Sequence, residues 1–288
     1  MFSTVYAAAN QRLQRASWTF AALIVGTGFL IARPAAAQTP KPADDTTYTL
    51  KRTYKAGDVD RYKLDYHMSL NIPQLGGDTE IIMQMVMKET TKEVKTDGTV
   101  VTEDLYEQGT VNLGGMEVDL TAQLPKLTIT RSKMKLDVKA EGGNEMLTDQ
   151  MVEMVKAMYQ QQDAVYPTKP VKIGDSWKVE MNTPTPDGKT VKTTGNATLV
   201  DTEMLNGQKT LKIKYVIEAA EGQSDTKMHG ETTSNVDIKS GKQLKVVSKT
   251  DGEAMGSKVS AKMTMTLMTG DDKKSGATTK IAPEKSDK

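Results

Sequence analysis

The sequence of 288 residues contains no cysteine and two histidines, His67 and His229. Without cysteine the chain has no disulfide, thiolate zinc site, iron–sulfur cluster or cysteine nucleophile. The histidines are far apart, and neither has a second ligand nearby in a metal-binding spacing. We therefore predict no metal site and no cofactor. A two-histidine site formed across strands is the alternative.

Phenylalanine is absent after residue 37, and Trp177 is the one tryptophan beyond that point. Charge of one sign is not in excess either, because 38 Lys and Arg residues face 37 Asp and Glu residues. Nucleic-acid binding rests on a surplus of basic side chains that neutralise phosphates. The balance therefore favours no nucleic-acid partner.

The motifs of several enzyme classes are also missing. There is no Gly-x-Ser-x-Gly nucleophile elbow, and no glycine-rich phosphate loop followed by a lysine. Acidic pairs such as Glu103 and Asp104 stand in segments that alternate as strands do, so the two carboxylates point to opposite faces. We interpret such pairs as a solvated charged surface. We predict a non-enzymatic protein with no catalytic residues.

The N-terminus has the pattern of an export signal. Arg12 and Arg15 precede an apolar run over residues 19–32, and three alanines at 35–37 provide a small-residue cleavage site. The run is shorter than the roughly 20 residues of a spanning helix. We predict a signal peptide over 1–37, a periplasmic or extracellular location and no membrane span after cleavage. The alternative is an uncleaved anchor.

Most of the chain alternates between apolar and polar residues, as a strand with one buried and one wet face requires. The longest run begins at Tyr62 and ends at Ile72, and His67 lies on its polar side. Turn pairs such as Asp97-Gly98 and Asn206-Gly207 separate the runs. The pattern predicts a mostly β (α+β) fold of about a dozen antiparallel strands with one helix. These would form an open or incomplete barrel or two related curved sheets.

One segment, residues 144–162, has helical spacing instead. Asn144 is a suitable N-terminal cap, and Pro167 ends the pattern. The apolar residues recur three and four apart on one stripe of the helix. They are Leu147, Met151, Met154, Val155 and Met158.

The segment separates two β-rich halves, residues 47–143 and 163–270. A polar leader (38–46) and a charged tail (271–288) flank them, and their compositions predict disorder. The halves share a Gly-Asp pair before an aromatic strand, Gly57-Asp58 in the first and Gly174-Asp175 in the second. We infer an internal duplication.

Methionine is the residue in surplus, with 18 in the chain. Two stripes concentrate it at strand and helix spacing. Because methionine is flexible and polarizable, it suits surfaces that adapt to apolar partners. We take both stripes as candidate ligand-binding residues: Met83, Met85, Met87, Leu147, Met151, Met154 and Met158. The alternative is that methionine fills the core of a protein without phenylalanine.

The stretch from Pro167 to Trp177 (PTKPVKIGDSW), with the export signal and the methionine-rich helix, resembles an uncharacterised bacterial exported-protein family, a domain of unknown function. The likeness spans about residues 48–268. It implies a β-rich exported protein and carries no catalytic residues. More distantly, long strands with a covering helix are similar to periplasmic carriers of lipoproteins and lipids. That likeness concerns the fold and transfers no site.

The sequence thus predicts an exported protein that binds an apolar or amphiphilic, lipid-like ligand in the cell envelope. The alternative is a non-catalytic structural or interaction protein of the envelope. The pattern leaves the oligomeric state open.

Overall fold

The computed structural model describes residues 46–72, 77–132, 135–145, 148–149, 151–153, 155–156, 158–159, 166–184, 190–219, 227–254 and 257–269. The signal peptide (1–37) and the tail (271–288) lie outside these residues, as does the leader apart from its last residue. They stay predictions.

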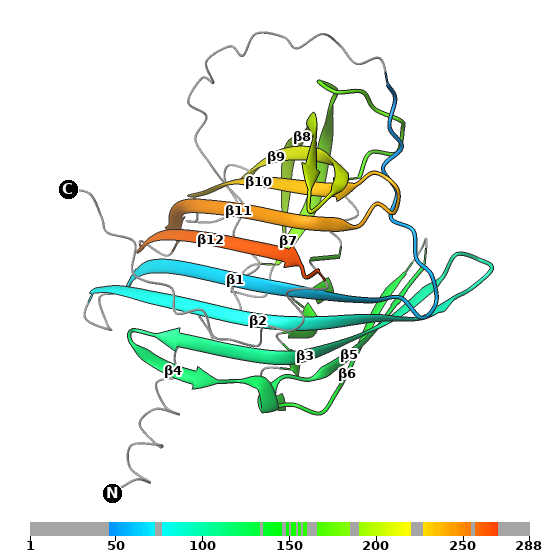
Figure 1. Ribbon diagram of the computed structural model, residues 1–288. Helices are drawn as coiled ribbons and strands as arrows, with labels where there is room; N and C mark the ends of the chain where they lie inside the picture. The colour runs from blue at the N-terminus through cyan, green and yellow to red at the C-terminus, as the bar shows by residue number, and fades with distance from the viewer. Residues whose placement is uncertain are drawn as a thin grey trace, which may run out of the picture.

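Twelve antiparallel strands form one sheet, which confirms the predicted mostly β fold (Figure 1). Their hydrogen-bonded order is β6-β5-β3-β2-β1-β12-β11-β10-β9-β8-β7, and β4 pairs with β3 beside this path. The strands are β1 (Val59–Ile72), β2 (Gly77–Val94), β3 (Val100–Leu113), β4 (Met116–Asp119), β5 (Lys126–Arg131), β6 (Leu136–Glu141), β7 (Ser176–Pro184), β8 (Thr190–Leu205), β9 (Gln208–Ala219), β10 (Lys227–Asp237), β11 (Gln243–Ala254) and β12 (Ser257–Leu267).

The predicted alternation corresponds to one buried and one wetter face of this sheet. On β1 the side chains of Tyr62, Tyr66 and Met68 are buried, whereas His67 is exposed. On β3 the buried positions alternate up to Tyr106 and resume at Gly109, because a bulge shifts the β2–β3 register there. A bulge adds a residue to one strand and bends the ladder.

The sheet is strongly curved (Figure 1). Its buried apolar residues form one cluster. The cluster contains Val138 of β6, Tyr66 of β1 and Val179 of β7, so it reaches from one end of the strand order to the other. We call the side of the sheet that carries these residues the inner face. Within the described chain, the end strands β6 and β7 are not hydrogen-bonded to each other. The sheet is therefore open.

One short helix packs on the inner face, and its described residues run from 145 to 159. The backbone N–H of Thr148 donates to the carbonyl of Asn144 at 2.8 Å, as expected at a helix start. Among its described residues, Met151, Val155 and Tyr159 are buried, each one turn after the last. The predicted end, residues 160–162, lies outside the described residues.

An extended segment before β1, residues 46–55, joins distant parts of the sheet; we call it the strap. Tyr48 pairs with Val171 just before β7, and the N–H of Thr53 donates to the carbonyl of Ser240 at 2.8 Å. Tyr48 and Leu50 are buried. The strap therefore links the start of β7 to the β10–β11 turn.

The two Gly-Asp turns make the same pair of backbone hydrogen bonds. The N–H of Gly57 donates to Thr91 on β2, whose N–H donates back to Asp58; Gly174 and Asp175 bond Leu199 on β8 in the same way. The register with the following strand shifts directly after each of these partners: after Thr91 in the β2–β3 ladder and after Leu199 in the β8–β9 ladder. This shared construction supports the inferred duplication. The two halves join through β1 and β12 in one continuous sheet.

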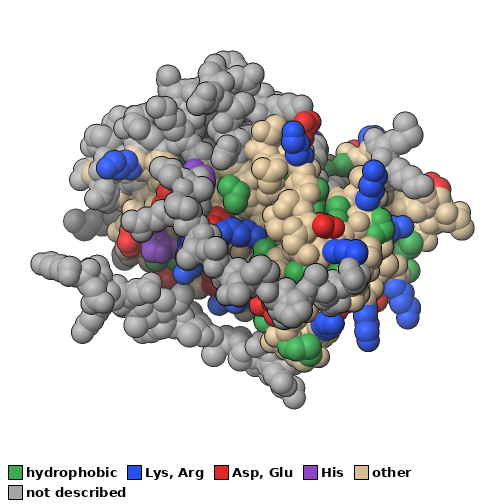
Figure 2. Space-filling view, turned by 90° about the horizontal axis from the view of Figure 1, so that it is seen from above, with side chains coloured by type: hydrophobic (Ala, Val, Ile, Leu, Met, Phe, Trp, Pro, Cys, Tyr) green, Lys and Arg blue, Asp and Glu red, His purple; other side chains and the backbone are tan. Residues whose placement is uncertain are grey.

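The visible described surface carries interspersed lysine, arginine and acidic side chains, with hydrophobic ones in small separate groups (Figure 2). This agrees with the balanced composition. Within the described part of the chain, no helix combines the length and the apolar character needed to cross a membrane.

Candidate functional site

The predicted methionine stripe of β2 lies on the inner face. Met83 and Met85 are buried, and Met87 is partly buried against the same apolar cluster. In the β1–β2 register Met83 is paired with Tyr66 and Met85 with Leu64. The stripe is therefore next to β1 on the inner face.

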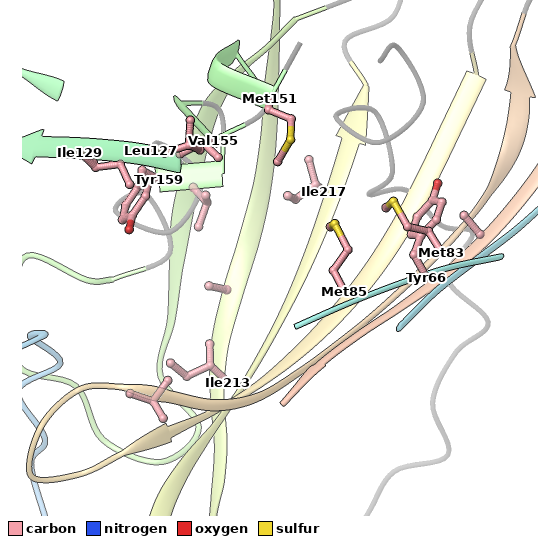
Figure 3. Packing of buried hydrophobic residues seen from close by; sticks show 14 of the residues in the cluster. Tyr66, Met83, Met85, Leu127, Ile129, Met151, Val155, Tyr159, Ile213 and Ile217 are labelled. Carbon is pink, nitrogen blue, oxygen red and sulfur yellow. The ribbon is translucent and has the colours of Figure 1, made fainter. Parts of the chain in front are cut away.

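The helix contributes Met151 to the same cluster. Figure 3 shows Met151 and Met85 approaching the apolar interior from the helix and from β2. Met158 is 39% exposed, so it lies at the surface. Leu147 and Met154 lie outside the residues whose side chains are described. The fold thus gathers Met83, Met85 and Met151, and leaves Met158 at the rim.

A charged residue continues the methionine stripe. Glu89 is the next residue of β2 after Met87 on the inner face, and it is buried. It forms an ion pair with Arg52 of the strap, whose side chain is also shielded from solvent. The hydroxyl of Tyr159 donates to the other carboxylate oxygen of Glu89 at 3.1 Å. Burial raises the pKa of Tyr159, so this hydroxyl keeps its proton.

Asp104 lies beside Glu89 in the β2–β3 register and is 0% exposed. Among the described residues, neither oxygen of its carboxyl group has a hydrogen-bond partner. Nε of Arg52 is also buried without one. An unpaired buried polar group costs about 1–3 kcal/mol. The expectation that Asp104 lies on a solvated surface is therefore wrong. The expectation that Glu103 and Asp104 point to opposite faces is right, because Glu103 is partly exposed.

Burial raises the pKa of Asp104 well above its usual value. The charge of Glu89 adds to this effect, and the guanidinium of Arg52 opposes it. A protonated carboxyl group offers one donor and one acceptor. Asp104 thus brings hydrogen-bonding capacity into an apolar interior.

A second guanidinium borders this group. The Arg131 guanidinium on β5 donates to the hydroxyl of Tyr54 and lies 5.0 Å from the centre of its ring. It is also 5.5 Å from the ring centre of Tyr159 on the helix. Arg52 lies 4.7 Å from the Tyr54 ring. We call Arg52, Tyr54, Glu89, Asp104, Arg131 and Tyr159 the polar cluster, which joins the strap and the helix to the sheet.

The sequence did not reveal the polar cluster, although the spacing of Glu89 and Asp104 indicates the strand face on which each side chain lies. Glu89 follows the methionines at period two, and Asp104 precedes Tyr106 at the same spacing. Charged residues are seldom buried unless they are paired. The partners, however, come from segments distant in the sequence, so the spacing by itself does not show them.

The two histidines lie apart from the polar cluster. His67 is 53% exposed, 3.8 Å from a carboxylate oxygen of Glu80. His229 is partly buried, and burial lowers its pKa to about 4 against the opposing charges of Asp251 and Glu231. No three His, Asp or Glu residues in the described part of the chain form a metal-binding group.

No protein-family model and no curated protein matches the sequence. Several solved structures, among them YmcC and DynF, are similar at a distance. The hypothetical lipoprotein YmcC from Escherichia coli (K12) is 11% identical, with a TM-score of 0.27, over 71% of this chain and 86% of that one. DynF, from the dynemicin biosynthesis pathway of Micromonospora chersina, is 9% identical, with a TM-score of 0.20, over 85% and 98%. Scores this low carry no argument about activity.

Proposed function

We propose that this protein is exported and binds an amphiphilic, lipid-like ligand on the inner face of its curved sheet, without catalytic turnover. The observation that carries the proposal is the burial of an unpartnered carboxyl group, Asp104, at the end of an apolar methionine stripe. Ligand sites are mostly apolar, with a few placed polar groups that fix orientation. An amphiphile offers both chemistries in one molecule.

The open sheet supports this function mechanically. Because β6 and β7 share no ladder within the described chain, a ligand can enter between them without breaking strand hydrogen bonds. Methionine side chains have three rotatable bonds and repack easily around a guest. Met83, Met85 and Met151 supply this adaptability from opposite sides of the interior.

Native mass spectrometry tests the proposal on full-length protein purified from its own host. We expect adducts with the mass of a lipid, and saturable uptake of the fluorescent fatty acid cis-parinaric acid. A chain that repeatedly carries no lipid and takes up no cis-parinaric acid contradicts the proposal. A purely structural envelope protein, the alternative, gives that result.

Methyl NMR with ¹³C-labelled methionine locates the ligand without altering the protein. On titration with cis-parinaric acid, the methyl signals of Met83, Met85 and Met151 should shift. Met204, which is 65% exposed, is the internal control and should not. Shifts confined to exposed methionines would place binding outside the inner face.

A further inference from the structure

A band of small hydroxyl side chains lies on the inner face, on the far side of β1 from the methionine stripe. Its members share burial and strand parity; we call them the hydroxyl band: Thr232, Ser234, Ser248 and Thr250. The ladders place Ser248 beside Met263 of β12, and Met263 beside Tyr66 of β1. The band is therefore on the same face as the apolar cluster.

Two of these hydroxyl groups have no partner. Oγ1 of Thr232 and Oγ of Ser248 bond each other at 2.9 Å. Oγ of Ser234 and Oγ1 of Thr250 are fully buried without a hydrogen bond to any described residue. Alanine or valine would fill these positions without burying an unpaired hydroxyl, so folding alone does not explain the choice.

The neighbours of the two free hydroxyls are uncharged, and around Thr250 they are small. Thr250 is paired with Gly230 on β10 and with Ala261 on β12. Ser234 is paired with Ile213 and Val246. With no charge in these ladder positions, an ionised headgroup placed here would lose its hydration without compensation. An uncharged oxygen acceptor would satisfy the hydrogen-bonding capacity of these hydroxyl groups.

We propose that the hydroxyl band binds the carbonyl oxygens of an acyl ester or acyl amide, so that the ligand is an uncharged acyl derivative in preference to a free fatty acid. Ser234 and Thr250 lie at ladder positions four residues apart, about 13 Å along the strands, so the carbonyl oxygen of one acyl group accepts a hydrogen bond from one of them. This inference rests on the proposed function and specifies its ligand.

Displacement of the fluorescent probe N-phenyl-1-naphthylamine from the full-length protein tests the preference. Monoolein and oleic acid carry the same chain, the first as a neutral ester and the second as a carboxylate. We expect monoolein to displace the probe at about tenfold lower concentration, the effect of one hydrogen bond at the upper end of its usual range. Equal potency, or a preference for oleic acid, overturns the inference.

The double variant Ser234→Ala/Thr250→Val assigns the preference to the band. It should weaken monoolein about tenfold, leave oleic acid unchanged and melt no lower than the wild type, because two unpaired groups are removed. Thr233→Val, on the opposite face of β10, is the matched control and should change neither ligand. Unchanged monoolein affinity in the double variant overturns the inference. Failure of the wild type to bind either ligand and the probe overturns the proposed function instead.

Discussion

The hydroxyl of Tyr159 on the helix donates a hydrogen bond to Glu89 on β2 at 3.1 Å. The other oxygen of the same carboxylate pairs with Arg52 of the strap. One side chain therefore ties three segments together that are remote in the sequence. Because the Glu89 carboxylate is buried, losing its pairing with Arg52 or Tyr159 would leave an uncompensated polar group in the interior, which costs free energy.

Replacing Glu89 tests this arrangement. Glu89→Gln keeps the shape and leaves the Arg52 guanidinium buried with an uncompensated charge, so the free energy of unfolding should fall by about 3–5 kcal/mol. Urea denaturation followed by circular dichroism measures it. Glu103→Gln is the control: Glu103 pairs with Lys92 near the surface at 3.0 Å, where the loss should not exceed about 1 kcal/mol. Equal losses would contradict a specific role for Glu89.

Asp104 predicts a pH dependence of stability. Its pKa is raised in the folded protein, so the folded state holds the proton more tightly than the unfolded state does. The stabilisation is complete below the ordinary aspartate pKa and is lost as pH rises towards the raised folded value. Asp104→Asn removes this titration. The variant should gain stability over the wild type progressively from about pH 4 upward.

Urea unfolding of both proteins between pH 4 and 8 measures the Asp104 effect, because other titrating groups cancel in the difference. A difference that stays constant over this range would show that Asp104 is ionised in the folded protein at all of these pH values.

Met85 and Met204 compare a buried with an exposed methionine. Met85→Ala should lower the free energy of unfolding by about 2–5 kcal/mol, because it removes a buried side chain. Met85→Leu, of similar volume, should cost less than about 1.5 kcal/mol. Met204→Ala should stay within about 0.5 kcal/mol. Thermal or urea unfolding measures these differences. A Met85→Ala effect as small as that of Met204→Ala would show that Met85 does not contribute to the packed core.

Gly241, in the β10–β11 turn, lies close against the strap. Its φ is +66°, and a Cβ there would lie 2.2 Å from the carbonyl oxygen of Lys51. Gly57 has φ +89° with nothing within 4 Å, so it carries the backbone cost without the collision. Both alanine variants should be destabilised by about 1 kcal/mol or more, and Gly241→Ala clearly further. Limited proteolysis within the strap should increase for Gly241→Ala alone. Equal behaviour of both variants would contradict close strap packing.

Local periodicity was enough to predict the strands and the helix. The run from Tyr62 became β1 because alternating side chains sort to opposite faces of any strand. Spacing also placed Met83, Met85 and Met151 towards the interior. It did not separate Met151 from Met158, because the side of a helix that is covered depends on where the sheet curves around it.

The polar cluster required the tertiary structure. Arg52, Glu89 and Tyr159 meet because the strap crosses the sheet and the helix packs on its inner face. Period two places Glu89 on the face of the methionines, but the spacing does not show the partners that allow a charged residue to be buried there. Spacing likewise did not show the burial of Asp104, which local reasoning assigned to the surface.

The sequence by itself determined that this chain contains no thiol chemistry and that it forms antiparallel strands around one helix, since composition and periodicity act over a few residues. Only the tertiary structure decided that both β-rich halves join one open sheet, and that the methionines, a buried carboxyl group and a band of hydroxyls share its inner face. Those outcomes depend on contacts between segments up to about two hundred residues apart, such as β1 with β12, and burial sets their energies.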